Sequence, residues 1–179
     1  MSSMKSNEEW IEAYKKGDIE AFNMLYHNLY EMLYCFLFRY TREEQLSMDI
    51  VHDTFERLQK TLHSYDVEKG TVKSYLFQIA YRLLINKLNR RKKWHSFLPF
   101  LVPTSNTQFS TDEKLAVQEA IAKLPEKQRG VILLTYYHDL PQEDIAQILS
   151  IPIGTVKSRL YNAIQFLKNE LKEDFHAEG

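Results

Sequence analysis

The chain has 179 residues, of which 44% are hydrophobic, and this apolar content excludes a disordered protein. Only five Gly and five Pro occur, too few for the turns of an all-β domain, and the single cysteine excludes a disulfide-stapled secreted domain. The net charge of −1 by itself points to no partner. The composition therefore predicts an all-α protein, built as one domain of ordinary size or as two small ones.

The first half of the chain shows the three- and four-residue apolar spacing of amphipathic helices. This spacing predicts two helices before residue 42, a third around residues 50–62 and a fourth around residues 75–88. Between the last two, Asp66 and Gly70 suit a turn. The four helices predict a first small bundle over residues 8–93.

Residues 94–111 contain no Lys, Arg, Asp or Glu and are interrupted by two prolines, so we expect a flexible linker there. Helical spacing resumes after it, breaks at Pro125 and continues to the end of a second unit, residues 112–173. The predicted fold is therefore all-α, with two small helical domains joined by a linker.

The N-terminal residues lack the basic and then apolar pattern of a signal peptide. No apolar run approaches the roughly 20 residues that a membrane span requires. We therefore expect the protein to be cytoplasmic.

Charge is distributed unevenly along the chain. Residues 61–110 carry 8 Lys and Arg against 2 Asp and Glu, whereas the segments on both sides are acidic. The basic segment includes a run of cations at residues 90–93. A local excess of cations is what a phosphate-contacting surface needs, because neutralised phosphates release counterions. The same run could instead only solvate a helix end.

Residues 141–171 have the pattern of a helix, a tight turn and a second helix. Pro141 suits a first helical turn, residues 150–154 end that helix, and Thr155 can cap the next one by accepting a backbone hydrogen bond. Outward-facing side chains of the second helix can reach a DNA major groove: Lys157, Ser158, Arg159, Tyr161 and Asn162. Similar hairpins occur in domains that never bind DNA, but these polar side chains favour a recognition helix.

Residues 120–171, which include LPEKQR and IPIGTVKSRL, resemble the promoter-binding domain four of extracytoplasmic-function (ECF) sigma factors. Residues 17–40, 49–58 and 71–93 resemble domain two of the same family. Both domains occur in the family's order. The resemblance implies a non-enzymatic subunit, without a cofactor, that directs core RNA polymerase to promoters.

The resemblance assigns a polymerase-binding role to the third predicted helix. Asp49, Asp53 and Phe55 match the surface that binds the clamp coiled coil of the polymerase's largest subunit. Two carboxylates and an apolar anchor would supply steering and a binding hot spot. Without the resemblance, Asp49 and Asp53 could equally be solvated helix carboxylates.

The resemblance also implies that residues 65–93 open and read the minus-ten promoter region, with a loop pocket that captures a flipped base. Unstacking that base costs a few kcal/mol, which stacking and hydrogen bonds must offset. The candidate stacking residues are Tyr65 and Tyr75, although aromatic residues at helical spacing are more often core. The candidate phosphate contacts are Lys73, Arg82, Lys87, Arg90 and Arg91.

For domain four, the resemblance implies contacts to minus-thirty-five DNA and to the polymerase flap. The expected DNA contacts are Thr155, Lys157, Ser158, Arg159, Tyr161 and Asn162. Free sigma factors of this type are usually held inactive by an anti-sigma factor, often membrane-anchored, which would be a further partner.

Two other classes of function compete with this interpretation. An enzyme would need a catalytic or metal-binding cluster, but none of the six His residues has metal-ligand spacing and no Gly-rich phosphate loop occurs. A conventional helix-turn-helix transcription regulator is the stronger rival. The two hypotheses differ in whether the N-terminal domain binds a polymerase subunit or a small signal.

Overall fold

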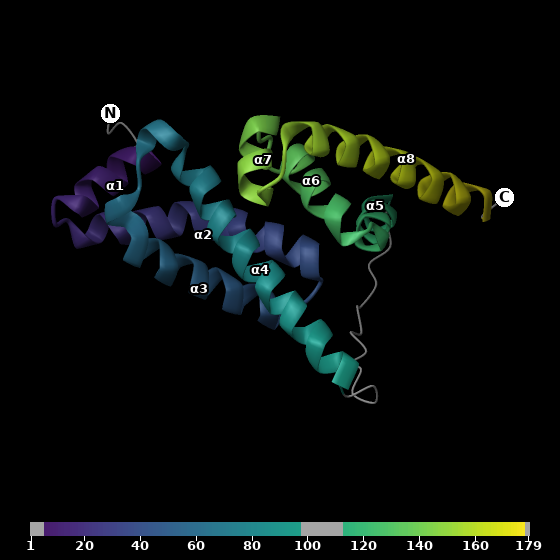
Figure 1. Ribbon diagram of the computed structural model, residues 1–179, viewed down its shortest axis with the longest axis horizontal. Helices are drawn as coiled ribbons and strands as arrows, with labels where there is room; N and C mark the ends of the chain where they lie inside the picture. The colour runs from purple at the N-terminus through teal and green to yellow at the C-terminus, as the bar shows by residue number, and fades with distance from the viewer. Residues whose placement is uncertain (1–5, 98–112, 178–179) are drawn as a thin grey trace.

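The computed structural model describes residues 6–97 and 113–177, which in these ranges form helices and connecting turns without a strand (Figure 1). The all-α prediction is therefore confirmed. The helices are α1 (Asn7–Lys15), α2 (Ile19–Thr41), α3 (Glu44–Thr61), α4 (Val72–Phe97), α5 (Glu113–Lys123), α6 (Glu126–Tyr136), α7 (Gln142–Leu149) and α8 (Ile153–Ala177). Two short 3-10 turns, Leu62–Ser64 and Val67–Lys69, connect α3 to α4.

The first helices begin and end where local chemistry favours it. Ser6 and Glu9 form a reciprocal capping box at the start of α1, and Asp18 accepts a hydrogen bond from the Ala21 amide at the start of α2. Arg42, in the left-handed conformation with φ 60°, ends α2. These caps satisfy backbone groups that a helix end would otherwise leave unpaired.

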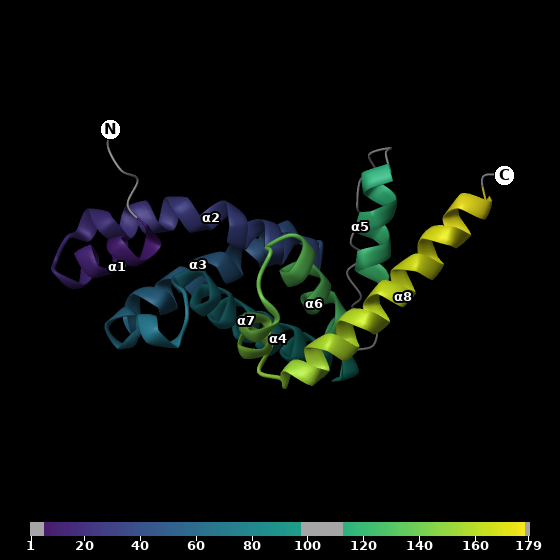
Figure 2. The same cartoon turned by 90° about the horizontal axis from the view of Figure 1, so that it is seen from above.

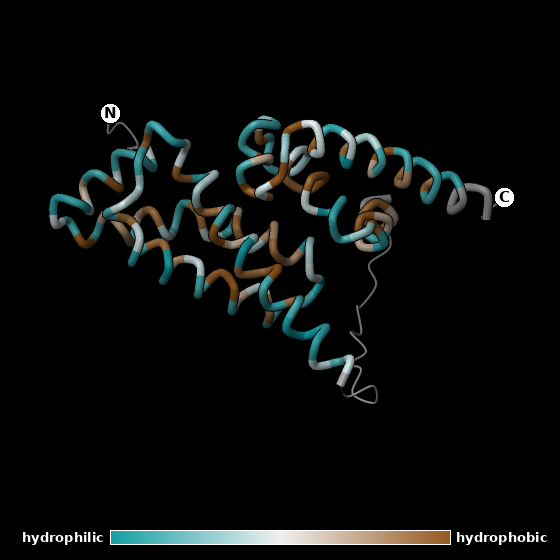
Figure 3. The backbone as a smooth tube through the Cα atoms, in the orientation of Figure 1, coloured by the Kyte–Doolittle hydropathy of each residue, from teal (hydrophilic) through white to brown (hydrophobic). Residues whose placement is uncertain are grey.

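Helices α2, α3 and α4 form the core of the first unit. Every fourth residue of α2, from Leu25 to Leu37, is at most 3% exposed. These side chains meet buried residues of α3 and α4 such as Leu58 and Leu76, and the alternation of apolar and polar stretches is visible along each helix in Figure 3. Each buried leucine stabilises the fold by about 1.5–3 kcal/mol relative to an exposed one.

Helices α5 to α8 form the second unit, with α6 at its centre. Residues 130–134 of α6 are all buried, because α6 packs against α7 and α8 on one side and against α2 on the other. Val156 and Ala163 of α8 are fully buried against this core. Helices α7 and α8 cross as the predicted helix-turn-helix (Figure 2).

The two units pack against each other along α4 and α7, and along α2 and α6. The His138 ring lies in this seam, with ring centroids 5.8 Å from Phe36 and 4.9 Å from Phe77. Gly130 of α6 also lies here, and a Cβ at this position would be 3.5 Å from the Tyr81 ring. The apolar cores of both units are therefore continuous across the seam.

Several expected boundaries differ from the structure. Helix α4 continues to Phe97, so residues 94–97, expected in the linker, are helical, while the remainder of the predicted linker lies outside the described residues. Helix α8 begins at Ile153, so the prediction of a Thr155 cap is wrong and Thr155 lies inside the first turn. A favourable capping residue does not start a helix when the chain before it, here after Pro152, can already turn. Among the described residues, no helix has the length and apolarity of a membrane span.

Candidate nucleic-acid interface

The loop between α3 and α4 borders a cavity of about 170 Å³. Its lining comes from residues 64–71, from the first turns of α4 and from Gln147 of α7. Asp66 stabilises the loop by accepting a hydrogen bond from the Glu68 amide at 3.0 Å. Gly70 has φ 145° and ψ 168°, a conformation that is essentially restricted to glycine. The pocket is thus built by turn chemistry that the sequence predicted at these residues.

Tyr65 stabilises the loop through its buried side chain. Its ring is only 8% exposed, and its hydroxyl donates a hydrogen bond to the Gly70 carbonyl at 2.8 Å. Burial, followed by the negative charges of Glu8 and Asp66, raises the pKa of Tyr65 to about 12, so the phenol keeps its proton at neutral pH. The backbone carbonyl of Tyr65 also accepts a hydrogen bond from Lys15 at 3.1 Å. In this structure the Tyr65 ring therefore stabilises the loop between α3 and α4.

Tyr75 is the more accessible of the two candidate aromatic residues. Its ring is partly buried, lies 5.5 Å from the Tyr65 ring and lines the cavity. Its hydroxyl donates to Thr61 Oγ1 at 3.0 Å. Tyr75 is thus held in place with part of its surface available to a ligand of the pocket.

The predicted phosphate contacts on α4 fall into two groups. Arg82 and Arg90 are exposed and form no hydrogen bond or ion pair with another described residue. The other three are engaged within the protein: Lys73 donates to the His138 carbonyl at 2.9 Å, Lys87 pairs with Asp53 at 2.9 Å, and Arg91 pairs with Glu43.

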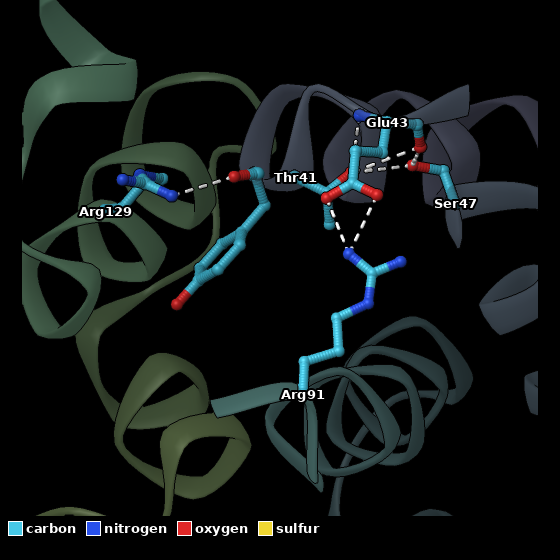
Figure 4. Close-up of polar contacts among 6 residues, drawn as sticks. Thr41, Glu43, Ser47, Arg91 and Arg129 are labelled. Atoms are coloured by element: carbon cyan, nitrogen blue, oxygen red, sulfur yellow. Dashed lines mark hydrogen bonds and ion pairs between the residues drawn. The ribbon is translucent and has the colours of Figure 1, made fainter. Parts of the chain in front are cut away.

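Figure 4 shows how the Glu43 carboxylate is held in position to pair with Arg91. Glu43 precedes α3, where its amide donates to Thr41 Oγ1 at 3.1 Å and its carbonyl accepts from Ser47 Oγ at 2.7 Å. The carboxylate is thereby presented to Arg91, whose Nη1 lies 2.7 and 2.8 Å from its two oxygens. Both side chains are partly exposed, so the pair adds no more than about 1 kcal/mol of stability.

The first turns of α8 present a polar face opposite the buried Val156 and Ala163. Lys157, Ser158, Tyr161 and Asn162 are exposed there, as the predicted recognition helix requires. Arg159 is only partly exposed, donates to the Lys127 carbonyl at 3.4 Å and lines a second cavity of about 460 Å³ together with Arg82. Thr155 is also partly buried. The exposed part of the predicted recognition surface therefore consists of Lys157, Ser158, Tyr161 and Asn162.

The candidate polymerase surface lies on α3. Asp49 is exposed and accepts a hydrogen bond from Gln45 at 2.9 Å, whereas Asp53 is paired with Lys87. Phe55, expected as the apolar anchor, is instead 3% exposed and packs against Tyr26 with ring centroids 4.5 Å apart. The structure thus places the Phe55 ring in the core. Met48, which is 43% exposed, is the apolar side chain that the sequence interpretation missed at this surface.

His138 is a buried titratable group that the sequence did not single out. His138 is 6% exposed, and its backbone carbonyl accepts the hydrogen bond from Lys73. Burial, followed by the positive charges of Lys73 and Arg39, lowers the pKa of His138 to about 4 despite an opposing effect of Asp139. Among the residues that the structure describes, no cluster of His, Cys, Asp and Glu could hold a metal ion.

Two family models match the chain. The model of sigma-70 region 2 matches residues 25–94 and that of sigma-70 region 4 matches residues 114–167. The ECF RNA polymerase sigma factor SigW of Bacillus subtilis (strain 168) is 29% identical over 180 residues, covering 91% of this chain and 95% of the relative. RNA polymerase sigma factor SigV of the same organism is 30% identical over 148 residues, covering 79% of this chain and 86% of the relative.

Solved structures share the fold. The sigma factor RpoE, in complex with the anti-sigma factor NepR from Bartonella quintana, has a TM-score of 0.74 at 22% identity, covering 86% of this chain and 98% of RpoE. CnrH, in complex with the cytosolic domain of CnrY, has a TM-score of 0.70 at 22% identity, covering 95% of this chain and 99% of CnrH. The region 2 and region 4 matches fall on the first bundle and on the helix-turn-helix unit, respectively. The chain therefore belongs to the ECF sigma factors of the sigma-70 family, which is not a class of enzymes.

Proposed function

We propose that this protein directs core RNA polymerase to a specific set of promoters and starts transcription there, as a cytoplasmic sigma factor without catalytic activity or a cofactor. One observation carries this proposal. The same chain has a loop pocket at Gly70 beside the basic helix α4 and, separately, the candidate recognition helix α8. A conventional helix-turn-helix regulator accounts for α7 and α8 but not for the loop pocket or the region 2 match.

Within this function, residues 8–93 act as domain two, residues 94–111 as the linker and residues 112–173 as domain four. Domain two docks on the clamp coiled coil of the polymerase's largest subunit through α3. Asp49 and Asp53 supply the negative charge for a basic partner, and exposed Met48 supplies an apolar contact that buried Phe55 cannot.

The minus-ten region is opened by the loop and α4. A base flipped out of the non-template strand enters the cavity beside Tyr75, while Tyr65 keeps the loop in shape. The strand's phosphates follow the cations of α4, beginning with the two that have no partner among the described residues, Arg82 and Arg90. Lys73, Lys87 and Arg91 join them when DNA replaces their present partners.

Domain four binds duplex minus-thirty-five DNA and the polymerase flap. Lys157, Ser158, Tyr161 and Asn162 face outward from the first turns of α8, and we assign base and phosphate contacts to them first. Arg159 and Thr155, which are partly buried, lie at the edge of this DNA-binding surface and add further contacts. An anti-sigma factor, often membrane-anchored in this family, would hold the protein inactive by covering the polymerase-binding surfaces of both domains.

Run-off transcription tests this function directly. Purified core polymerase is given fragmented DNA of the source organism, with and without the protein. New discrete transcripts that require the protein are expected, and their start sites identify its promoters. If a folded protein neither binds core polymerase nor adds a start site, the conventional regulator becomes the better explanation.

A further inference from the structure

The larger cavity, of about 460 Å³, lies where α4 faces α6, α7 and the first turns of α8 (Figure 2). It shares no lining residue with the loop pocket. Its volume falls within the range of roughly 300–1,000 Å³ that is typical of small-molecule sites. The cavity is therefore large enough for a small ligand, and promoter recognition as proposed above gives it no occupant.

The charge of this cavity favours an anion. Four cationic side chains line it against a single carboxylate, that of Glu126: Arg82, Lys92, Lys127 and Arg159. The carboxylate is already paired with Lys92 at 2.8 Å. Among the residues that the structure describes, the side chains of Arg82 and Lys127 form no hydrogen bond or ion pair, and Arg159 only donates to the Lys127 carbonyl at 3.4 Å. Three cations are therefore available to phosphate oxygens, which guanidinium groups bind through parallel hydrogen bonds.

The beginning of α6 adds to this positive charge. Glu126 and Lys127 are the first two residues of α6, and both line the cavity. The first amides of a helix have no partner within that helix, and the helix dipole concentrates positive charge at the same end. The positive end of α6 and the available cations therefore lie at one cavity, an arrangement that suits a phosphorylated ligand.

The remaining lining suits a planar aromatic group. Four aliphatic side chains come from α4, from the end of α7 and from the turn after it: Ile85, Ile148, Leu149 and Ile151. The partly buried Tyr81 also lines the cavity. Burial raises the pKa of Tyr81, and the positive charge of Arg159 opposes that rise, so the guanidinium lies close to the phenol. An aromatic ring beside a cation can thus bind a base by stacking while the cation binds an attached phosphate.

Two amide side chains of α4 complete the lining. Asn86 and Asn89 are exposed, line the cavity and have no hydrogen-bond partner among the described residues. Each amide offers two donor hydrogens and one acceptor oxygen, which is the chemistry that reads the edge of a base or a ribose hydroxyl. A simple inorganic anion would leave these amides and the aliphatic side chains without a role.

We propose that this cavity binds a nucleoside polyphosphate, with its phosphates between Arg82, Lys127 and Arg159 and its base beside Tyr81. Nucleotide binding does not depend on the proposed function, because the purified chain can be tested without polymerase or a promoter. A nucleotide in the cavity would occupy Arg82 and Arg159, to which DNA phosphates are assigned above. Nucleotide and promoter DNA would therefore compete for both arginines.

Equilibrium dialysis of the purified full chain against radiolabelled GTP, and separately against radiolabelled ATP, tests the proposal. EDTA is present so that the phosphates keep their full charge. We expect saturable binding of one nucleotide per chain for at least one of the two. Guanosine or adenosine, which lack phosphate, and tripolyphosphate, which lacks a base, should each displace the label at least tenfold less effectively than the unlabelled nucleotide.

Two results of this measurement would overturn the proposal. The first is the absence of saturable binding by both nucleotides. The second is displacement by tripolyphosphate as effective as displacement by the nucleotide, because the cavity would then be a site for anions of any kind.

Substitutions locate the site within the chain. Arg82→Ala with Lys127→Ala removes two exposed cations of the cavity and should weaken nucleotide binding at least tenfold. The matched control, Arg90→Ala with Lys157→Ala, removes two exposed cations that do not line the cavity and should weaken binding less than twofold. An equal loss in both pairs would show that only net charge matters and would contradict the cavity as the site.

Filling the cavity gives a measurement that leaves the charge unchanged. Asn86→Trp places a large ring at an exposed position that lines the cavity, and it should weaken nucleotide binding at least fivefold. Gln165→Trp, at an exposed position of α8 outside the cavity lining, is the control and should bind as the original chain does. Circular dichroism checks that both variants keep their helices. Unchanged binding by a folded Asn86→Trp variant would place the nucleotide elsewhere.

Discussion

Lys87 of α4 and Asp53 of α3 form an ion pair at 2.9 Å, which joins a cation of the candidate DNA surface to a carboxylate of the candidate polymerase surface. Their side chains are 32% and 41% exposed, so water and salt can reach both. Such a pair contributes no more than about 1 kcal/mol to stability. A basic partner that binds Asp53 would release Lys87, which would couple polymerase docking to the availability of a phosphate contact.

This coupling makes Asp53→Asn informative. The substitution should weaken binding to core polymerase about three- to tenfold at low salt, because one charge of the docking surface is lost. The free energy of unfolding should fall by less than about 1 kcal/mol. Affinity is measured by fluorescence anisotropy at two salt concentrations. Glu31→Gln, which removes an exposed carboxylate from α2, is the control, and an equal loss of affinity there would argue against a specific role for Asp53.

Substitutions in the recognition helix should distinguish phosphate contacts from base contacts. Lys157→Ala should weaken binding to all promoters alike and reduce the salt dependence of binding by about one counterion. Asn162→Ala should instead cost about 1–3 kcal/mol at its own base position and relax sequence preference there. Both are measured with a library of minus-thirty-five duplexes.

Two further substitutions in α8 complete that comparison. Lys168→Ala, exposed on the same helix but beyond its first turns, should have little effect. Arg159→Ala should weaken promoter binding while core polymerase binding stays intact. Normal binding and initiation by the Arg159→Ala holoenzyme would show that this helix face is wrongly assigned.

The loop pocket should depend on Gly70. Gly70→Ala forces a side chain into a conformation with φ 145°, which costs about 1–3 kcal/mol, and it displaces the carbonyl that Tyr65 holds. We expect lower stability in urea unfolding and impaired promoter opening. Gly154→Ala, at a helical glycine with nothing within 4 Å of an added Cβ, should leave stability unchanged or raise it by about 1 kcal/mol. A Gly70→Ala variant as stable as the original chain would contradict the strained loop.

Stability should also depend on pH through His138. Its pKa in the folded chain is lowered to about 4, so the unfolded chain binds more protons between that value and the ordinary value of 6.5. The free energy of unfolding should therefore be highest above pH 6.5 and fall as the pH drops toward 4, by on the order of 2 kcal/mol from this group. Urea unfolding at pH 7.5 and 5 measures the effect.

His138→Phe tests whether that pH dependence comes from the seam. The variant keeps an aromatic ring between Phe36 and Phe77 but cannot gain a proton, so the fall in stability between the two pH values should become smaller. His52→Gln, at an exposed position on α3, should leave the pH dependence as it was. An unchanged slope in His138→Phe would place the titrating group elsewhere.

Hydrophobic periodicity predicted the helices well where a helix buries a single stripe of side chains, as α2 and α8 do. The leucines of α2 and the apolar residues of α8 carry that signal without any knowledge of their partners. Phe55 lies four residues after buried Val51, a spacing that indicates the core face, whereas the resemblance assigned Phe55 to the polymerase surface. The burial of Phe55 follows the apolar spacing of the helix.

The seam between the two units could not be predicted in the same way. Ser74 and Asp144 are 70 residues apart, and each has the pattern of a polar residue on a solvated helix face. Their contact depends on how two finished helices dock, which periodicity within one helix does not encode. His138 likewise stands in a short connection, where burial follows from the neighbouring unit and not from local sequence.

Promoter opening separates the two candidate functions most directly, because a sigma factor opens DNA whereas a conventional regulator binds it as duplex. Permanganate reacts with unstacked thymines and can be applied to a promoter found by run-off transcription. We expect reactive thymines in the minus-ten region only when core polymerase and this protein are both present. Stable binding to the promoter with no reactive thymine in that region would contradict a sigma-factor function.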